Sequence, residues 1–120
     1  MIFLFKNCHL LQQLNLSNFN TSNVIDMYHM LYWCSSLEEL NLSNFDTRKT
    51  IFMTGIFAGC SSLKFLDILN FNTNNMRYMF YECVSLEEII ISNFDTENID
   101  DMSYLFYKCL SIKKINIKLI

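Results

Sequence analysis

The twelve residues CSSLEELNLSNF, at positions 34–45, decide the fold of this chain because the chain repeats them. Each of the five cysteines opens one copy, and successive cysteines are 26, 26, 23 and 26 residues apart. The other copies are CHLLQQLNLSNF at 8–19, CSSLKFLDILNF at 60–71, CVSLEEIIISNF at 83–94 and CLSIKKINIK at 109–118. A unit copied at a nearly fixed period of about 20 to 50 residues indicates a repeat array, in which each turn packs against its neighbours.

The first half of each unit has the pattern L-x-x-L-x-L-x-x-F, which predicts a short strand. The alternation across Leu40, Asn41 and Leu42 has the period of a half-buried strand. Pairing of each strand with its copy in the next unit would make a parallel sheet along the array. An Asn-Thr or Asp-Thr turn is expected next, because these side chains bond nearby backbone groups. It lies at 20–21, 46–47, 72–73 and 95–96.

The second half of each unit carries apolar residues at helical spacing. In residues 99–109 they are Ile99, Met102, Leu105, Phe106 and Cys109. This spacing predicts a short α or 3₁₀ segment. Its N-cap is expected at Asn98 or Asp100. The third unit lacks three residues between Asn75 and Met76, so its helix is expected to be shorter or absent.

The repeat pattern resembles a known class of solenoid. Leucine-rich repeats share L-x-x-L-x-L, with a strand and a helical or 3₁₀ segment in each unit. More narrowly, the chain resembles the BspA-like leucine-rich repeat surface protein family. NLSNFDT at 41–47 and MFYECVSL at 79–86 carry this resemblance, which covers essentially the whole chain. It implies an α/β repeat fold: a leucine-rich-repeat solenoid with a short parallel β-strand and a short helical segment, α or 3₁₀, per turn.

We expect residues 1–120 to form one domain of about four full turns, with partial turns at both ends, as a fragment of a longer array. The resemblance implies a cell-surface or secreted location. No signal peptide is recognised, because Lys6 and Asn7 interrupt the N-terminal apolar run and no small-residue cleavage site follows. Terminal units expose core and strand edges, so end-to-end self-association is a further expectation.

Composition and charge narrow the range of partners. The formal net charge is −3, which gives no basic patch for binding nucleic acid. No apolar run reaches the roughly 18 residues that a membrane-spanning segment needs. We therefore expect neither a nucleic-acid partner nor direct membrane insertion.

The cysteines and other polar residues are predicted to be structural. Zinc sites favour close cysteine pairs, whereas these cysteines mark one position per repeat, so we expect buried thiols without metal. His9 and His29 occupy non-equivalent positions, and we expect no catalytic activity and no cofactor. Serines are expected to bond to backbone at 36, 62, 85 and 111, and asparagines to form a hydrogen-bonded ladder at 18, 44, 70 and 93.

The aromatic residues form two sets. One column is predicted to be a core spine and consists of Phe19, Phe45, Phe71 and Phe94. Tyr32, Tyr81 and Tyr107 form another, with Ala58 in the same register. These tyrosines are either partly buried between turns or part of a tyrosine-rich convex surface that contacts a partner.

A binding site is predicted on the concave face of the sheet. Strand alternation turns every second side chain outward, and most of these positions are polar. Phe65, Leu69 and Ile90 break this rule, and Glu39, Asp67 and Glu88 surround them. An exposed apolar cluster with a charged rim is typical of a contact site. The acidic rim favours a basic partner, with affinity that weakens as salt rises.

These observations predict a non-catalytic binding module for protein or glycan recognition, in adhesion or another surface interaction. The alternative is a structural spacer, or a piece of an array with no binding activity of its own.

Overall fold

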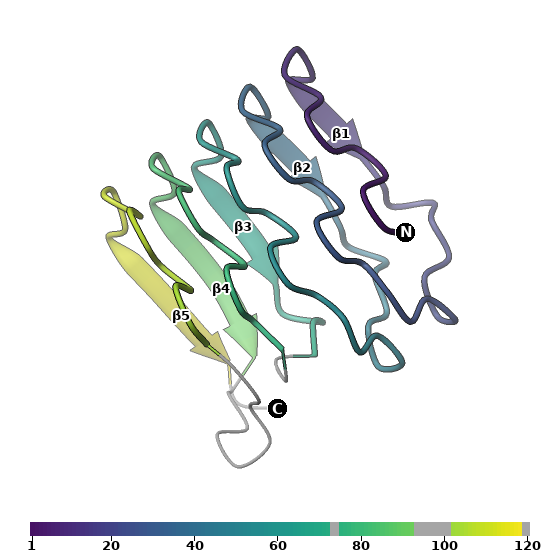
Figure 1. Cartoon of the computed structure of the whole chain (residues 1–120). Coiled ribbons are helices and arrows are strands. Elements are labelled where there is room, and N and C mark those ends of the chain that lie inside the picture. Colours follow the sequence, from purple (N-terminus) through teal and green to yellow (C-terminus); the bar gives the residue numbers. More distant parts are fainter. Residues whose placement is uncertain (73–74, 93–101, 119–120) are drawn as a thin grey trace.

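The computed structural model describes residues 1–72, 75–92 and 102–118, and within them each repeat contributes one short strand. The strands run parallel and lie side by side along one face of the coil (Figure 1). They are β1 (Gln13–Asn15), β2 (Glu39–Asn41), β3 (Phe65–Ile68), β4 (Glu88–Ser92) and β5 (Lys114–Lys118). The predicted parallel solenoid is confirmed.

Strand register follows the repeat. Phe65 pairs with Glu88, and Glu88 pairs with Lys114, so equivalent positions of successive units are in contact. The period of two buries Leu66 and leaves Phe65 and Asp67 exposed, as the alternation predicts. The ladder is nevertheless interrupted, because β1–β2 form one sheet and β3–β4–β5 form another. We call the outward side of these five strands the strand face.

The predicted helical segments are wrong, since the described residues contain no helix. In their place each unit has a turn chain, which is two successive four-residue turns, as in 27–30 and 31–34. The amide of the fourth residue donates to the carbonyl of the first, over 3.2 Å in the first turn and 3.1 Å in the second. The third residues, His29 and Trp33, have φ of 50° and 57°. A positive φ at this position alone marks a type II turn.

The turn chain recurs at 1–8, 53–60, 76–83 and 102–109. The positive-φ positions there are Phe3 and Asn7, Gly55 and Gly59, Tyr78 and Glu82, and Tyr104 and Lys108. We call the outward side of these five segments the turn face.

Helical spacing and the turn chain bury the same positions, which explains the wrong prediction. Two turns of four residues bury the first and fourth residue of each, here Met27, Met30, Leu31 and Cys34. An amphipathic helix also buries positions i, i+3, i+4 and i+7. The difference lies in the backbone. The Leu31 amide donates to the carbonyl of Ile56 in the next unit over 3.0 Å, rather than to a carbonyl within its own segment.

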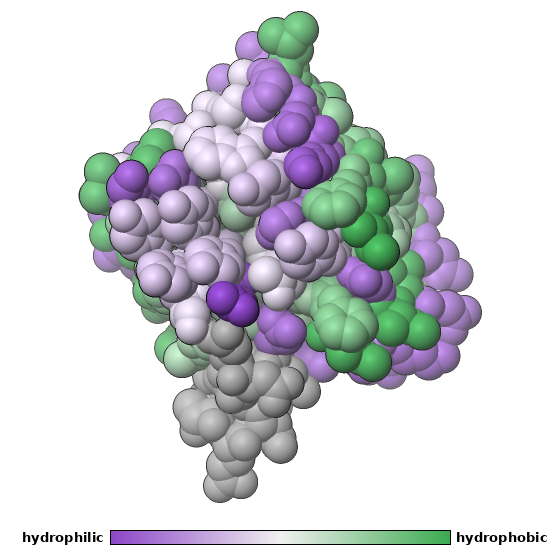
Figure 2. All heavy atoms as spheres, in the orientation of Figure 1, coloured by the Kyte–Doolittle hydropathy of each residue, from purple (hydrophilic) through white to green (hydrophobic). Residues whose placement is uncertain are grey.

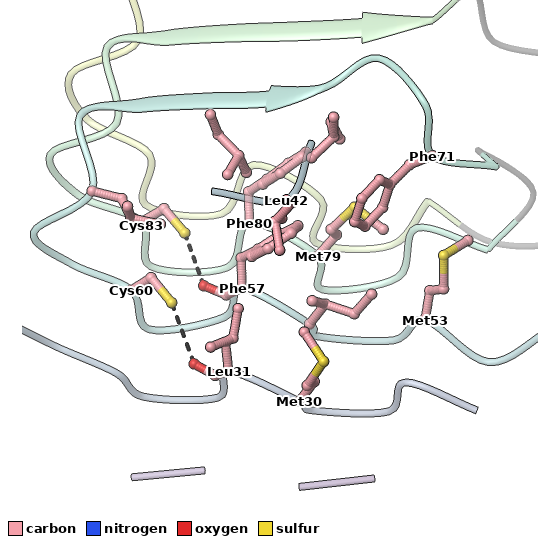
Figure 3. Close-up of a cluster of buried hydrophobic side chains, with 14 of the residues drawn as sticks. Met30, Leu31, Leu42, Met53, Phe57, Cys60, Phe71, Met79, Phe80 and Cys83 are labelled. Carbon is pink, nitrogen blue, oxygen red and sulfur yellow. Dashed lines mark hydrogen bonds between the residues drawn. The ribbon is translucent and has the colours of Figure 1, made fainter. Parts of the chain in front are cut away.

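Two columns of aromatic rings fill the core between the strands and the turn chains. Phe45 and Phe71 stack with centroids 6.0 Å apart, and Phe57 and Phe80 stack at 6.1 Å. Figure 3 shows Phe57, Phe80 and Phe71 of these columns beside sulfur-containing side chains. The predicted phenylalanine spine is therefore confirmed at Phe45 and Phe71. Phe19 is 40% exposed because only one neighbouring unit covers it.

Several predicted features lie outside the described residues. These are Phe94, Asn93, the turn at 95–96, and the expected N-caps Asn98 and Asp100.

The cysteines form a ladder of buried thiols. Sγ of Cys60 donates to the carbonyl of Leu31 over 3.3 Å, and Sγ of Cys83 donates to that of Phe57 over 3.1 Å (Figure 3). Burial raises the pKa of both thiols above the usual value. The predicted burial is confirmed for Cys34, Cys60 and Cys83, whereas Cys8 and Cys109 in the end units are partly covered.

Other polar repeat positions also bond to the neighbouring unit. Ser62 Oγ donates to the carbonyl of Ser35 over 2.6 Å, and Ser111 Oγ donates to that of Val84 over 2.7 Å. Both serines thus do what the sequence predicts. Thr47, fully buried, accepts the amide of Asn72 over 2.6 Å. No helix in the described residues is long and apolar enough to cross a membrane.

Candidate binding site

The structure places five of the six predicted site residues on the strand face, and the sixth, Leu69, comes directly after it in the chain. Phe65 and Asp67 lie on β3, Glu88 and Ile90 lie on β4, and Leu69 follows β3. Glu39 is the first residue of β2. Phe65 is 49% exposed, a large apolar ring in contact with water.

Half of this set lines one groove. A groove of about 290 Å³ runs between the segments 40–43 and 65–71, where the ladder between β2 and β3 is interrupted. Phe65, Asp67 and Leu69 line the groove. Glu39, Glu88 and Ile90 do not line it, so they can contact only a partner that extends beyond the groove.

The sequence did not reveal the opposite wall of this groove. Leu40, Asn41, Leu42 and Ser43 form that wall, and their pattern is the ordinary one of the repeat. Nothing in these residues marks an interrupted ladder, because the interruption depends on how two whole units sit against each other.

Two of the rim carboxylates already have structural contacts. Asp67 Oδ1 accepts the amide of Leu69 over 3.0 Å, and Asn41 Oδ1 accepts the amide of Ser43 in the same way. Such turns are what Asn and Asp provide after strands. Glu88 Oε1 lies 3.7 Å from Lys114 Nζ. The acidic rim is therefore partly neutralised on the β5 side.

Metal-ligating side chains do not cluster in the described part of the chain. Within it, no three His, Cys, Asp or Glu side chains are placed to hold a metal ion. The structure does bring His9 to Ser35, with Nδ1 3.2 Å from Oγ, a contact that the sequence pattern does not predict. A nucleophilic serine further requires a group that orients the base and donors for the oxyanion.

Comparison with known proteins gives one match. A family model described as "Mycoplasma protein of unknown function, DUF285" matches residues 1–118 of the chain. No curated protein and no solved structure matches the chain.

Proposed function

This chain belongs to the DUF285 family, and we propose that it is a non-catalytic binding module. Its strand face recognises a protein or a glycan, and the groove between β2 and β3 is the centre of the contact. The exposed ring of Phe65, on the rim of that groove, is the observation that carries this proposal.

A stacked array suits this role. Each unit adds one row of side chains, so the strand face is an extended surface with little curvature within a unit. An apolar group that is half exposed on such a surface gains free energy when a partner covers it. Phe65 and Leu69 provide this gain, and Glu39 and Asp67 add charge at the edge.

The proposal also includes a narrower family, a location and a biological role. We place the chain among BspA-like leucine-rich repeat proteins, at the cell surface or secreted, with a role in adhesion. The repeated NLSNFDT and MFYECVSL stretches support this assignment. Each unit of this chain carries a turn chain where such repeats are expected to carry a helical segment.

One observation favours the alternative, a spacer without binding activity. Asp67 and Glu88 are held by Leu69 and Lys114, which are contacts within the array itself. A spacer needs only such contacts between units.

Affinity capture distinguishes the two functions. The parent chain, immobilised, is exposed to extracellular-matrix proteins and to a glycan array, beside a variant with Phe65→Ser and Ile90→Thr. A matched control is Phe52→Ser, since Phe52 is 50% exposed and lies outside the groove. We expect the parent and the control to capture the same partner and the double variant to lose it, with binding weaker at high salt.

Two results contradict the proposal. Capture by the double variant equal to that of the parent, with circular dichroism unchanged, excludes the strand-face site. No saturable partner for the parent supports the spacer.

A further inference from the structure

The outer sides of the two end units expose residues that interior units bury. We call the outer side of the turn chain 1–8 and β1 the first-unit face, and the outer side of the turn chain 102–109 and β5 the last-unit face. Leu4 on the first-unit face is half exposed. Ile117 on the last-unit face is also half exposed, whereas Ile91, its counterpart one unit earlier, is buried. Each face is therefore a layer of the core that another unit could cover.

Hydrogen bonds between successive turn chains run in one direction. The amides at the third, fifth and seventh positions of one turn chain donate to the carbonyls at the second, fourth and sixth positions of the next. Phe3 thus donates to Tyr28 over 3.1 Å. In the described part of the chain, the equivalent amides of the last unit have no acceptor in another unit. The last-unit face therefore presents three amide donors, which belong to Tyr104, Phe106 and Lys108.

The first-unit face presents the matching acceptors. The carbonyls of Ile2, Leu4 and Lys6 stand at the positions that accept in each later unit, and no described amide of another unit donates to them. The two turn chains also share one backbone conformation, since φ is 54° at Phe3 and 57° at Tyr104. Donors on one face and acceptors on the other thus have the arrangement of an interior junction.

The cysteine ladder has the same direction. Each thiol donates to a carbonyl of the preceding unit, as Cys34 Sγ does to Phe5 over 3.0 Å and Cys109 Sγ does to Phe80 over 2.9 Å. The Phe106 carbonyl stands at the next accepting position, and no thiol of the described residues reaches it. The thiol at the matching position of a first unit is that of Cys8.

Two leucines distinguish these faces from the interior junctions. Leu10 is 93% exposed and Leu110 is 80% exposed. Leu10 stands at the register of Ser111, and Leu110 stands at the register of Val84, and Ser111 Oγ donates to the Val84 carbonyl over 2.7 Å. A first unit placed after a last unit therefore brings Leu10 against Leu110. In Figure 2, which views the turn face, hydrophobic atoms project at the tip of the array above β1 and at its edge beside β5.

Charge favours this order of units over the pairing of two last-unit faces. Lys114 and Lys118 of β5 have Gln13 and Ser17, both uncharged, as their equivalents in the first unit. Two β5 strands paired antiparallel about Asn116 would set Lys114 of one copy opposite Lys118 of the other. Like charges directly opposite each other destabilise a strand pair.

We propose that copies of this chain join head to tail, with the last-unit face of one copy against the first-unit face of the next. The three amides donate to the three carbonyls, and Leu110 of one copy packs on Leu10 of the other. The occupant is a second copy because this one chain carries both sets of complementary groups. Such a contact is heterologous, so it extends into a filament, and the filament repeats the strand face along its length.

Lysine at either leucine tests this contact. Sedimentation velocity of the full chain, over a concentration series up to the high micromolar range, measures association. Leu10→Lys blocks the first-unit face and Leu110→Lys blocks the last-unit face, and Ile51→Lys is the matched control because Ile51 is exposed on an interior unit. We expect the parent and the control to form species larger than a dimer. Each leucine variant alone should need a concentration about tenfold higher or more, because the contact would bury an unpaired charge.

Mixing the two leucine variants separates head-to-tail joining from other contacts. Each variant keeps one intact face, so an equimolar mixture should form a 1:1 complex and nothing larger. The variant with Phe65→Ser and Ile90→Thr should associate like the parent, because the contact does not use these two residues.

Four results overturn the proposal when circular dichroism shows that the variants are folded. They are a parent that stays monomeric, a mixture that forms no complex, association of either leucine variant alone at the concentration of the parent, and loss of association in Ile51→Lys. The third indicates that two like faces pair, and the fourth indicates a lateral contact.

Discussion

The strand half and the turn half of each unit hold the array together differently. The strand ladder is interrupted between β2 and β3. The turn chains are joined at all four junctions, by amide-to-carbonyl bonds of 3.1 Å from Phe3 to Tyr28, 3.0 Å from His29 to Thr54, 2.9 Å from Gly55 to Arg77 and 3.0 Å from Tyr78 to Ser103. The turn half therefore carries hydrogen bonds across every junction between units, whereas the strand half has one junction without a strand ladder.

The two halves also differ in backbone strain. Strand residues take an ordinary extended conformation. In the turn chains, eight described residues other than glycine have positive φ, which costs about 1–2 kcal/mol each for an L-residue. The bonds between units and the buried first and fourth residues of each turn must offset that strain. This difference predicts opposite responses to glycine in the two halves.

The largest effect is expected in the strand half. Leu66 on β3 is 1% exposed, whereas its neighbour Phe65 points outward. Leu66→Ala should lower the free energy of unfolding by about 3 kcal/mol, and Phe65→Ala by about 0.5 kcal/mol or less. Urea denaturation followed by circular dichroism measures both. Equal losses would mean that β3 does not have the described register.

Much of the strand half was predictable from the sequence, because alternation of apolar and polar residues is typical of half-buried strands. The turn half was not, since helices and chains of type II turns bury the same positions. One local signal was present: the two glycines of the chain lie four residues apart, at the registers of His29 and Trp33. A four-residue glycine spacing favours repeated turns over a helix.

The candidate site lies in the half of the unit that the sequence predicts. The outward apolar residues Phe65 and Ile90 were visible from strand alternation. The positive φ of His29 and Tyr78 in the turn chains was not visible, because the spacing of apolar residues does not encode it.

A second prediction concerns a substitution that destabilises the turn half. Gly59 has φ of 76°, and the Trp33 ring covers it. Gly59→Val should cost about 2–3 kcal/mol, because a β-branched residue is strained at positive φ and its side chain overlaps the indole. In a Trp33→Ala background the additional cost of Gly59→Val should fall, since the overlap is gone and only backbone strain remains. An unchanged cost would show that the ring does not cover Gly59.

A third prediction concerns the cysteine ladder, whose thiols bond the turn chains of successive units to each other. Burial raises the pKa of Cys60 and Cys83 above the ordinary 9.0, so these thiols stay neutral in the folded chain and ionise only on unfolding. Their contribution to stability is complete below pH 9 and is lost as the pH rises above it, by about 1.4 kcal/mol per pH unit for each thiol. Urea midpoints from pH 7 to 11 measure this loss.

The matched control for this pH series replaces both thiols with alanine. The double variant should be less stable at pH 7 and should lose less stability above pH 9. Parallel pH curves for parent and variant would show that these thiols are ionised, or exposed, in the folded state.

The central claim is that the second half of each unit is a chain of type II turns and not a helix. Substitution of Glu82 by glycine tests this claim. This residue has φ of 55°, and the amide of Cys83 closes its turn onto the carbonyl of Phe80 over 3.1 Å. The informative quantity is the difference in unfolding free energy between Glu82→Gly and Glu82→Ala, because both variants lose the same contact with Lys108.

At positive φ, alanine retains the strain that glycine relieves, so the glycine variant should be the more stable by about 1 kcal/mol. In a helix the order reverses, and glycine is the less stable by about 1 kcal/mol. Urea denaturation of the two variants therefore decides the sign. A glycine variant that is more stable supports the turn chain, and one that is less stable contradicts it.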